Sequence, residues 1–160
     1  MITVAKMRPF NDTINGDEGK KWFICWLKEN NFTDITDTDT ISQFCHYDIE
    51  ATLNSVKYCF ELKNRTFPSY KYGDVLLSGE KYDYLNNINA RVILVTFYTD
   101  KFVMIDIKKR KPDEITTQKC KKQTVFSDNR VIEKKVVKWK LKDLKMLDYD
   151  RRNLETSSWI

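Results

Sequence analysis

The sequence predicts one α/β domain, residues 1–160, with a mixed central β-sheet flanked by helices. Three patterns support this: an amphipathic segment at 17–30, a strand pair at 48–63, and a nearly continuous apolar run at 91–98. The run is typical of a strand covered on both faces, and 101–107 can return beside it. A strand pair, a helix and a second strand pair produce a mixed sheet with helices on its faces.

Residues 17–30 predict a helix because Trp22 and Trp26 recur at helical spacing among other apolar side chains. Glu18 lies in its first turn, where an acid also favours the helix dipole, so this position has an explanation without a role in a site. Residues 31–40 are rich in Asp, Thr and Asn and predict a loop.

The strand pair at 48–63 contains the most informative residues of the chain. A two-residue turn at Asn54-Ser55 places Asp48 opposite Glu61 on the neighbouring strand. Opposed residues share a face with their Cβ atoms roughly 5 Å apart, so the two carboxylates repel each other unless a cation lies between them. Lys63 follows Glu61 by two residues and therefore projects from the same face.

This arrangement suits hydrolysis of a phosphodiester by a metal-activated water. Mg²⁺ prefers oxygen ligands, which Asp48, Glu61 and the carbonyl of Leu62 can supply, and Mn²⁺ is an alternative ion. Lys63 could orient or deprotonate the water, or stabilise the developing charge. A bulge would bring Glu50 to the place of Asp48. An ordinary solvated strand face is the alternative interpretation.

Residues 64–77 predict a loop with a short extended run at 75–77. Ser78 can cap a helix at about 79–87. Lys81 lies on this helix, either as a surface lysine or as a contributor to the site.

Charge is uneven along the chain: residues 1–100 contain 11 Lys/Arg and 14 Asp/Glu, and residues 101–160 contain 17 and 9, for a net charge of +5. A basic region beside an acidic one suits a polyanionic partner such as nucleic acid, although a Lys-rich surface also serves solubility. The basic residues concentrate in a predicted hairpin at about 115–142, whose lysines could instead protect an edge strand. The candidate nucleic-acid-binding residues are Arg65, Lys71, Lys81, Lys121, Lys122, Lys134, Lys135 and Lys138, with Trp139 to stack on a base.

Four scattered cysteines without metal-ligand spacing indicate buried thiols in a reducing compartment. With neither an apolar signal core nor a membrane-spanning run, we expect a cytoplasmic protein without membrane contact. Low Gly and Pro with abundant Asn, Lys and Tyr suggests an AT-rich source such as a phage, which would place the protein in the host cytoplasm. His46 is the single histidine, which excludes His-based triads; it packs near the site or donates a proton to a leaving group.

Glu18 on a helix, Asp48 at a strand start and Glu61-Leu62-Lys63 on the next strand resemble the PD-(D/E)XK nuclease superfamily, which includes restriction enzymes and Holliday-junction resolvases. A polar loop and a helix with Lys81 continue the resemblance, which covers about residues 14 to 107. Tyr47 stands where the motif has proline. The resemblance implies a restriction-endonuclease-like fold.

The resemblance further implies an Mg²⁺-dependent nuclease, with DNA preferred as substrate, endonuclease action expected, and homodimers as in many resolvases. Asp48 and Glu61 would bind the metal, Lys63 would serve the water, and Glu18 would complete the outer shell. The alternative is an inactive protein of the same fold that binds nucleic acid or an acidic protein partner.

Overall fold

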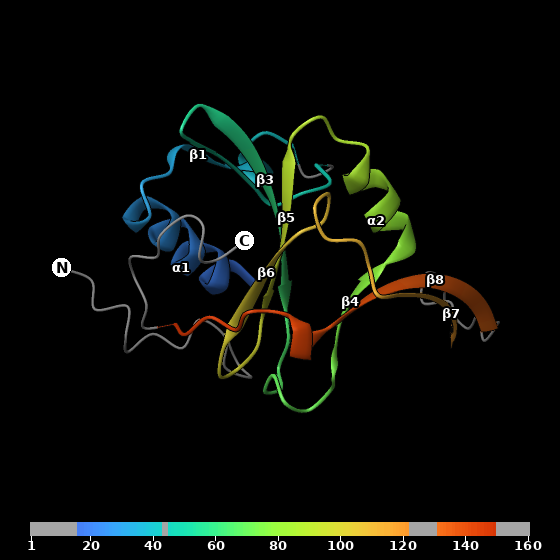
Figure 1. Ribbon diagram of the computed structural model, residues 1–160. Coiled ribbons are helices and arrows are strands. Elements are labelled where there is room, and N and C mark those ends of the chain that lie inside the picture. The colour runs from blue at the N-terminus through green and yellow to red at the C-terminus, as the bar shows by residue number, and fades with distance from the viewer. Residues whose placement is uncertain (1–15, 43–44, 122–130, 150–160) are drawn as a thin grey trace.

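A five-stranded mixed sheet forms the centre of the protein in the computed structural model, which describes residues 16–42, 45–121 and 131–149 (Figure 1). The strand order is β1-β2-β3-β5-β6, in which β3 and β5 are parallel and the other pairs antiparallel. The predicted α/β class with a mixed central sheet flanked by helices is confirmed. The strands are β1 (Thr33–Asp37), β2 (Ile49–Leu53), β3 (Val56–Asn64), β5 (Arg91–Phe97) and β6 (Phe102–Asp106).

The β2–β3 hairpin has the predicted two-residue turn. Asn54 and Ser55 have φ angles of 50° and 66°, as the tight turns that match strand twist require. The pairing runs without a slip from Leu53 opposite Val56 to Ile49 opposite Phe60. Asp48 directly precedes this pairing, and its backbone N–H donates to the carbonyl of Phe60, the residue opposite Ile49. Its charge raises the pKa of Glu61, so the two carboxylates lie near each other.

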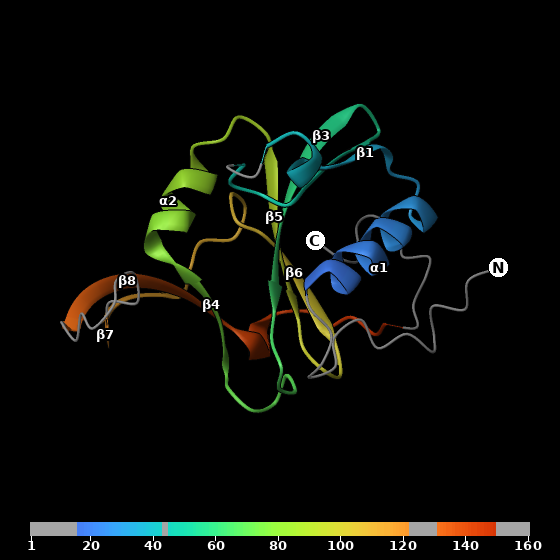
Figure 2. The ribbon, with the colours of Figure 1, turned by 180° about the vertical axis from the view of Figure 1, so that it is seen from behind.

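The two faces of the sheet have separate cores. Helix α1 (Gly16–Glu29) covers one face and buries Trp22 and Trp26 against Phe60 and other residues of the sheet. Helix α2 (Gly79–Asn86) lies on the other face, beside a second sheet (Figure 2). Because side chains alternate along β3, Phe60 faces α1, whereas its neighbours Cys59 and Glu61 face α2.

The second sheet has three strands in the order β4-β8-β7. They are β4 (Asp74–Ser78), β8 (Val131–Lys140) and β7 (Glu114–Lys121). The predicted basic hairpin is therefore present as β7 and β8, although its turn lies outside the described residues. β8 also pairs with β4 along its other edge, so the lysines of β8 do not protect a sheet edge. Short 3-10 helices follow β1 (Thr38–Thr40) and β8 (Leu141–Asp143).

The prediction of a loop over residues 31–40 is wrong, because β1 pairs with β2 there. This edge strand is short and polar, and its register shifts between Thr33 and Thr36, with Asp34 at a φ of 50°. It thus carries no alternation of apolar side chains from which a strand could be inferred. None of the helices in the described ranges is long and apolar enough to cross a membrane.

Replacing Ser78 by alanine should lower the free energy of unfolding by about 1 kcal/mol, which is about 2–4 °C in the thermal midpoint. The Ser78 hydroxyl caps α2 by accepting a hydrogen bond of 3.2 Å from the backbone N–H of Lys81. Ser78→Thr, which keeps the acceptor, is the control. An equal loss in both variants, measured by thermal unfolding, would contradict the capping role.

Candidate nuclease site

Asp48 is fixed at the start of the hairpin by its own carboxylate. Its Oδ2 accepts a hydrogen bond of 2.8 Å from the backbone N–H of Leu62, and its backbone N–H donates to the carbonyl of Phe60 at 2.9 Å. The carboxylate thus accepts from the N–H of Leu62 in place of a backbone carbonyl of the neighbouring strand. This leaves Oδ1 for another partner and points the acid at the end of the ladder, toward Glu61.

Glu61 is buried, with an exposed fraction of 4%, between two lysines. Its Oε1 lies 3.3 Å from Nζ of Lys63 and 3.4 Å from Nζ of Lys81. Burial raises the pKa of Glu61 above its usual value, the charge of Asp48 raises it further, and the two lysines oppose both effects. The balance disfavours the ionised form of Glu61, chiefly because the carboxylate is buried.

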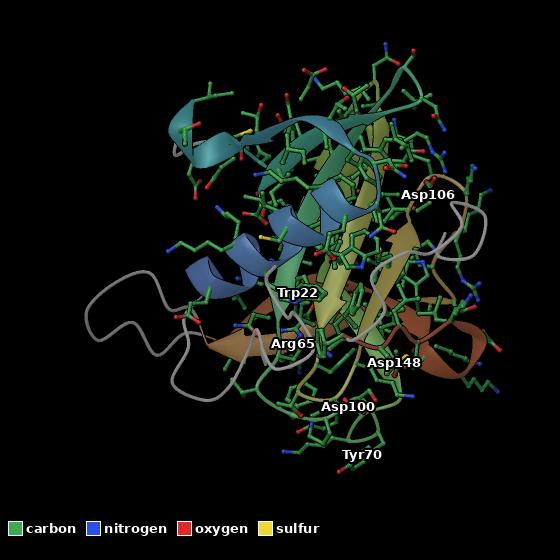
Figure 3. All side chains as sticks on the ribbon, turned by 90° about the vertical axis from the view of Figure 1, so that its left-hand side faces the viewer. Trp22, Arg65, Tyr70, Asp100, Asp106 and Asp148 are labelled. Atoms are coloured by element: carbon green, nitrogen blue, oxygen red, sulfur yellow. The ribbon has the colours of Figure 1, made fainter. Side chains whose placement is uncertain are left out.

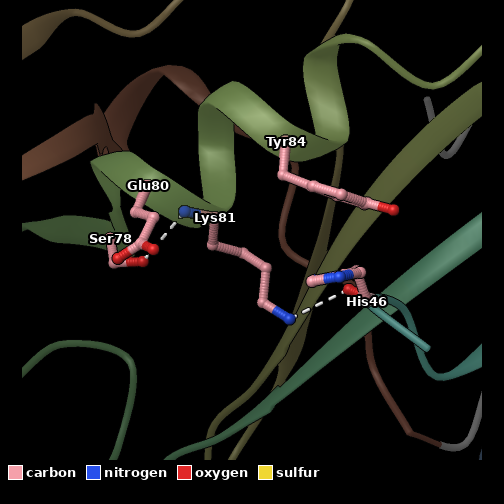
Figure 4. A pocket seen from close by; sticks show the side chains of 5 residues that line it. All are labelled: His46, Ser78, Glu80, Lys81 and Tyr84. Atoms are coloured by element: carbon pink, nitrogen blue, oxygen red, sulfur yellow. Dashed lines mark hydrogen bonds between the residues drawn. The ribbon is translucent and has the colours of Figure 1, made fainter. Parts of the chain in front are cut away.

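Lys81 reaches this site from α2, far along the chain from Asp48. Its Nζ also donates a hydrogen bond of 2.9 Å to the backbone carbonyl of His46 (Figure 4). The ring of His46 stacks on Tyr84 of the same helix. His46, Lys81 and Tyr84, together with Ser78 and Glu80, line an open cavity of about 280 Å³. The expected packing of His46 near the site is therefore observed, and the cavity gives solvent and ligands access to the lysine.

Replacing Lys81 by methionine should raise the pKa of Glu61 further, because it removes one of the two positive charges near Oε1 while keeping the aliphatic stem. NMR titration of the Glu61 carboxyl carbon measures this shift. Lys135→Met is the matched control, because Lys135 forms its ion pair with Asp83 instead. An unchanged Glu61 titration in Lys81→Met would contradict the contact.

Glu18 and Glu50 do not join this cluster in the structure. Glu18 is exposed in the first turn of α1, and no hydrogen bond or ion pair in the described ranges connects it to Asp48 or Glu61. Glu50 accepts a hydrogen bond from the hydroxyl of Tyr47 and pairs with Lys57 at 3.3 Å. Glu50 is therefore engaged elsewhere, while the outer-shell role of Glu18 and the ligand role of the Leu62 carbonyl stay predictions.

The carboxylates fit a hard divalent cation, although they provide only two acids. In the described part of the chain, no group of three or more His, Cys, Asp and Glu residues is placed to hold a metal. The donor chemistry nevertheless suits Mg²⁺ or Mn²⁺, ions that commonly bind through one or two carboxylates and retain several waters. Glu61 keeps its Oε2 beyond the lysine contacts and Asp48 keeps Oδ1, so both can contribute a ligand.

The basic candidates other than Lys81 do not gather in one place. Lys138 lies on β8 beside Leu76 of β4 and borders the same cavity as Arg65. Lys135 is exposed in the middle of β8, next to the part that pairs with β4, and forms an ion pair with Asp83 at 2.7 Å. Lys134 is exposed beside it. Lys71 lies in the loop after β3. Lys121 ends β7, its side chain outside the described set, and Lys122 lies outside the described residues.

The proposed stacking role of Trp139 is wrong. Its side chain is fully buried, its Nε1–H donates a hydrogen bond of 3.0 Å to the carbonyl of Arg110, and its ring lies against Tyr82. β8 is the central strand of its sheet, and Trp139 belongs to the face that packs under α2. An indole held in this way cannot reach a base.

Thr96 is a residue of this region that the sequence analysis did not identify. It lies opposite Lys63 in the parallel pairing of β5 with β3. Its hydroxyl is buried and has no hydrogen-bond partner among the described residues. Buried hydroxyls normally have a partner, so Thr96 is available to a water or ligand beside Lys63. The signal for it was a polar residue within the apolar run at 91–98.

No protein-family model matches this chain, and no curated protein matches it. Among solved structures the chain is similar to Hjc of Archaeoglobus fulgidus, a Holliday junction resolvase from an archaeal hyperthermophile. The two share 13% sequence identity over 82% of this chain and 96% of the resolvase chain, with a TM-score of 0.47.

Proposed function

We propose that the protein is a nuclease that hydrolyses phosphodiester bonds of nucleic acid with the help of Mg²⁺ or Mn²⁺. The observation that carries the proposal is the buried Glu61, which faces Asp48 and contacts both Lys63 and Lys81. The resemblance of Asp48 and Glu61-Leu62-Lys63 to the PD-(D/E)XK motif also supports it. DNA as the substrate, cleavage within the strand and a homodimeric state rest on that resemblance.

Asp48 and Glu61 would hold the divalent ion through the oxygens that their present contacts leave available. When bound, the ion would activate a water and neutralise charge on the phosphate. Burial serves this purpose, because a carboxylate excluded from water interacts more strongly with a cation. Backbone hydrogen bonds of the hairpin fix Asp48, and two lysines hold Glu61, so little reordering of either acid is needed on binding.

Lys63 and Lys81 would act on the substrate and the attacking water. Lys63 is about one-third exposed, so its ammonium can reach solvent while it contacts Glu61. From there it can orient a water or stabilise negative charge on a phosphate oxygen. Lys81, fixed by His46, supplies a second positive charge from the helix side. Arg65 and Lys138 extend the positive surface along the substrate path.

The direct test is cleavage of labelled single-stranded, duplex and branched DNA, and of RNA, with Mg²⁺, Mn²⁺ or EDTA. We expect cutting that requires the metal and that Glu61→Ala abolishes without loss of the fold, as judged by circular dichroism. Cutting that is insensitive to EDTA, or equal in Glu61→Ala, would overturn the proposal. Salt-sensitive binding without cutting would instead identify an inactive binding protein on this fold.

A further inference from the structure

A second cavity, of about 380 Å³, lies between the two sheets at the carboxyl ends of β3 and β5. Arg65 comes directly after β3 and Tyr98 directly after β5, while Asp74 and Lys138 belong to the second sheet. Arg65, Tyr70 and Asp100 mark this end of the molecule in Figure 3, far from Asp106 at the other end of the sheet. The volume is in the range of small-ligand sites.

Aromatic rings form one side of this cavity. Phe67 packs edge-on against Tyr72 at 4.8 Å between ring centroids and lies 5.9 Å from Tyr98. Tyr98 is almost fully buried, whereas Tyr72 is 55% exposed. A fixed ring at the base and an accessible ring at the mouth form a surface on which a flat, aromatic ligand can stack.

Cations surround these rings. The guanidinium of Arg65 lies 3.4 Å from the carbonyl of Leu76, and Lys138 borders the same space. Nζ of Lys71 lies 5.7 Å and 5.5 Å from the ring centroids of Phe67 and Tyr72. No carboxylate in the described ranges pairs with Arg65 or Lys138, so both charges remain available to an anionic ligand.

The cavity continues the face of β3 that holds the candidate site. The backbone N–H of Arg65 donates to the carbonyl of Phe97 at 2.9 Å, which extends the β3–β5 pairing by one residue. Because every second side chain of a strand points to the same side, Glu61, Lys63 and Arg65 project from one face of the extended β3. Successive side chains of this set are about 7 Å apart. A ligand that stacks beside Arg65 can thus present a phosphate to Lys63.

The loop that carries Phe67 and Tyr72 is tied down. The carboxylate of Asp100 accepts hydrogen bonds of 2.7 Å from both the backbone N–H and the hydroxyl of Ser69. Hydrogen bonds to a charged acceptor are among the stronger ones. The aromatic rings are consequently placed before a ligand arrives, which lowers the entropy cost of binding.

We infer that this cavity binds an unpaired base of a nucleic-acid strand, with the adjoining phosphate directed along β3 toward Lys63. Stacking on aromatic rings beside cations is the chemistry by which single strands are held, and Asp74 provides an acceptor for a base amino group. A paired base is already stacked within its duplex and is not available. The inference rests on the proposed function and narrows its substrate to single strands or to duplexes with unpaired positions.

The test is fluorescence anisotropy of labelled oligonucleotides in EDTA, where metal-dependent cleavage does not proceed. Tyr72→Ala should weaken single-strand binding about tenfold, because it removes a ring on which one base stacks, and leave fully paired duplex binding unchanged. Tyr70→Ala is the matched control, because Tyr70 is in the same loop and 83% exposed but does not line the cavity. It should bind single strands like the wild type.

Wild-type affinity in Tyr72→Ala, or equal losses for single strand and duplex, would overturn the inference. A free mononucleotide that binds as tightly as the oligonucleotide, with the same loss in Tyr72→Ala, would overturn the assignment to a strand. The outcomes separate from those of the proposed function. If the protein binds single strands through Tyr72 but cleaves no substrate, only the proposed nuclease activity is overturned. If the protein cleaves nucleic acid but Tyr72→Ala binds single strands like the wild type, only the assignment of the cavity is overturned.

Discussion

Replacing Lys63 by methionine is expected to lower metal-dependent cleavage about 10³-fold, within the range of 10²–10⁴ that positioned acid–base groups contribute. Methionine keeps an aliphatic stem of similar length but removes the ammonium 3.3 Å from Glu61. Substrate binding should change little, because Lys63 supplies only one of the positive charges on this surface. Initial rates of cleavage at saturating Mg²⁺ measure the loss.

Lys57→Met is the matched control for this experiment. Lys57 projects from the same face of β3 and pairs with Glu50 at 3.3 Å, the same distance as Lys63 from Glu61. It lies at the other end of the strand and is 56% exposed at its side chain. Its replacement should leave cleavage near the wild-type rate. Equal losses in the two variants would show that general charge, rather than the position of Lys63, governs activity.

The pH profile separates two roles of Lys63. Its charge lowers the pKa of Glu61, so Lys63→Met should also move the acid limb of the rate profile to higher pH. If lost ionisation of Glu61 were the whole effect, raising the pH would restore the rate. A rate that stays low on the plateau would identify a direct action of the ammonium on the water or the phosphate.

The closeness of Asp48 to Glu61 could be inferred from the sequence because the geometry is local, although the observed pairing ends one residue earlier, at Ile49 opposite Phe60. A two-residue turn at Asn54-Ser55 fixes the pairing of the strands that it joins, and the period of two then fixes the face of each side chain. Lys63 follows from Glu61 by the same alternation. The observed register agrees with this reasoning from Leu53 to Ile49.

Contacts between distant segments could not be placed in this way. The helix with Lys81 and its cap at Ser78 follow from local pattern, but its contact with Glu61 depends on how α2 packs across the sheet. The sequence Lys138-Trp139-Lys140 looks exposed, yet Trp139 is buried because β8 lies between β4 and β7. The cavity beside Arg65 gathers segments that no spacing rule connects.

Adding Mg²⁺ is expected to raise the thermal midpoint of the wild type at pH 8 and to have little effect near pH 4.5. Because the pKa of Glu61 is raised above 4.5, folding favours its protonated form. The stability that the protonated Glu61 contributes is complete below pH 4.5. It is lost as the pH rises through the pKa that Glu61 has in the folded protein. Mg²⁺ requires the ionised acid, so its effect grows over the same interval and reaches about 2.7 kcal/mol at 100 times Kd.

Glu61→Gln should change both the stability at pH 8 and the response to Mg²⁺. Without metal it should unfold at a higher temperature than the wild type at pH 8, because a neutral amide avoids the burial cost and the repulsion from Asp48 that raise the pKa of Glu61. It should also lose the response to Mg²⁺. Glu50→Gln removes a carboxylate that binds Tyr47 and Lys57 instead, so it should keep that response. A Mg²⁺ effect that survives in Glu61→Gln would place the ion elsewhere, and its loss in both variants would reflect general charge.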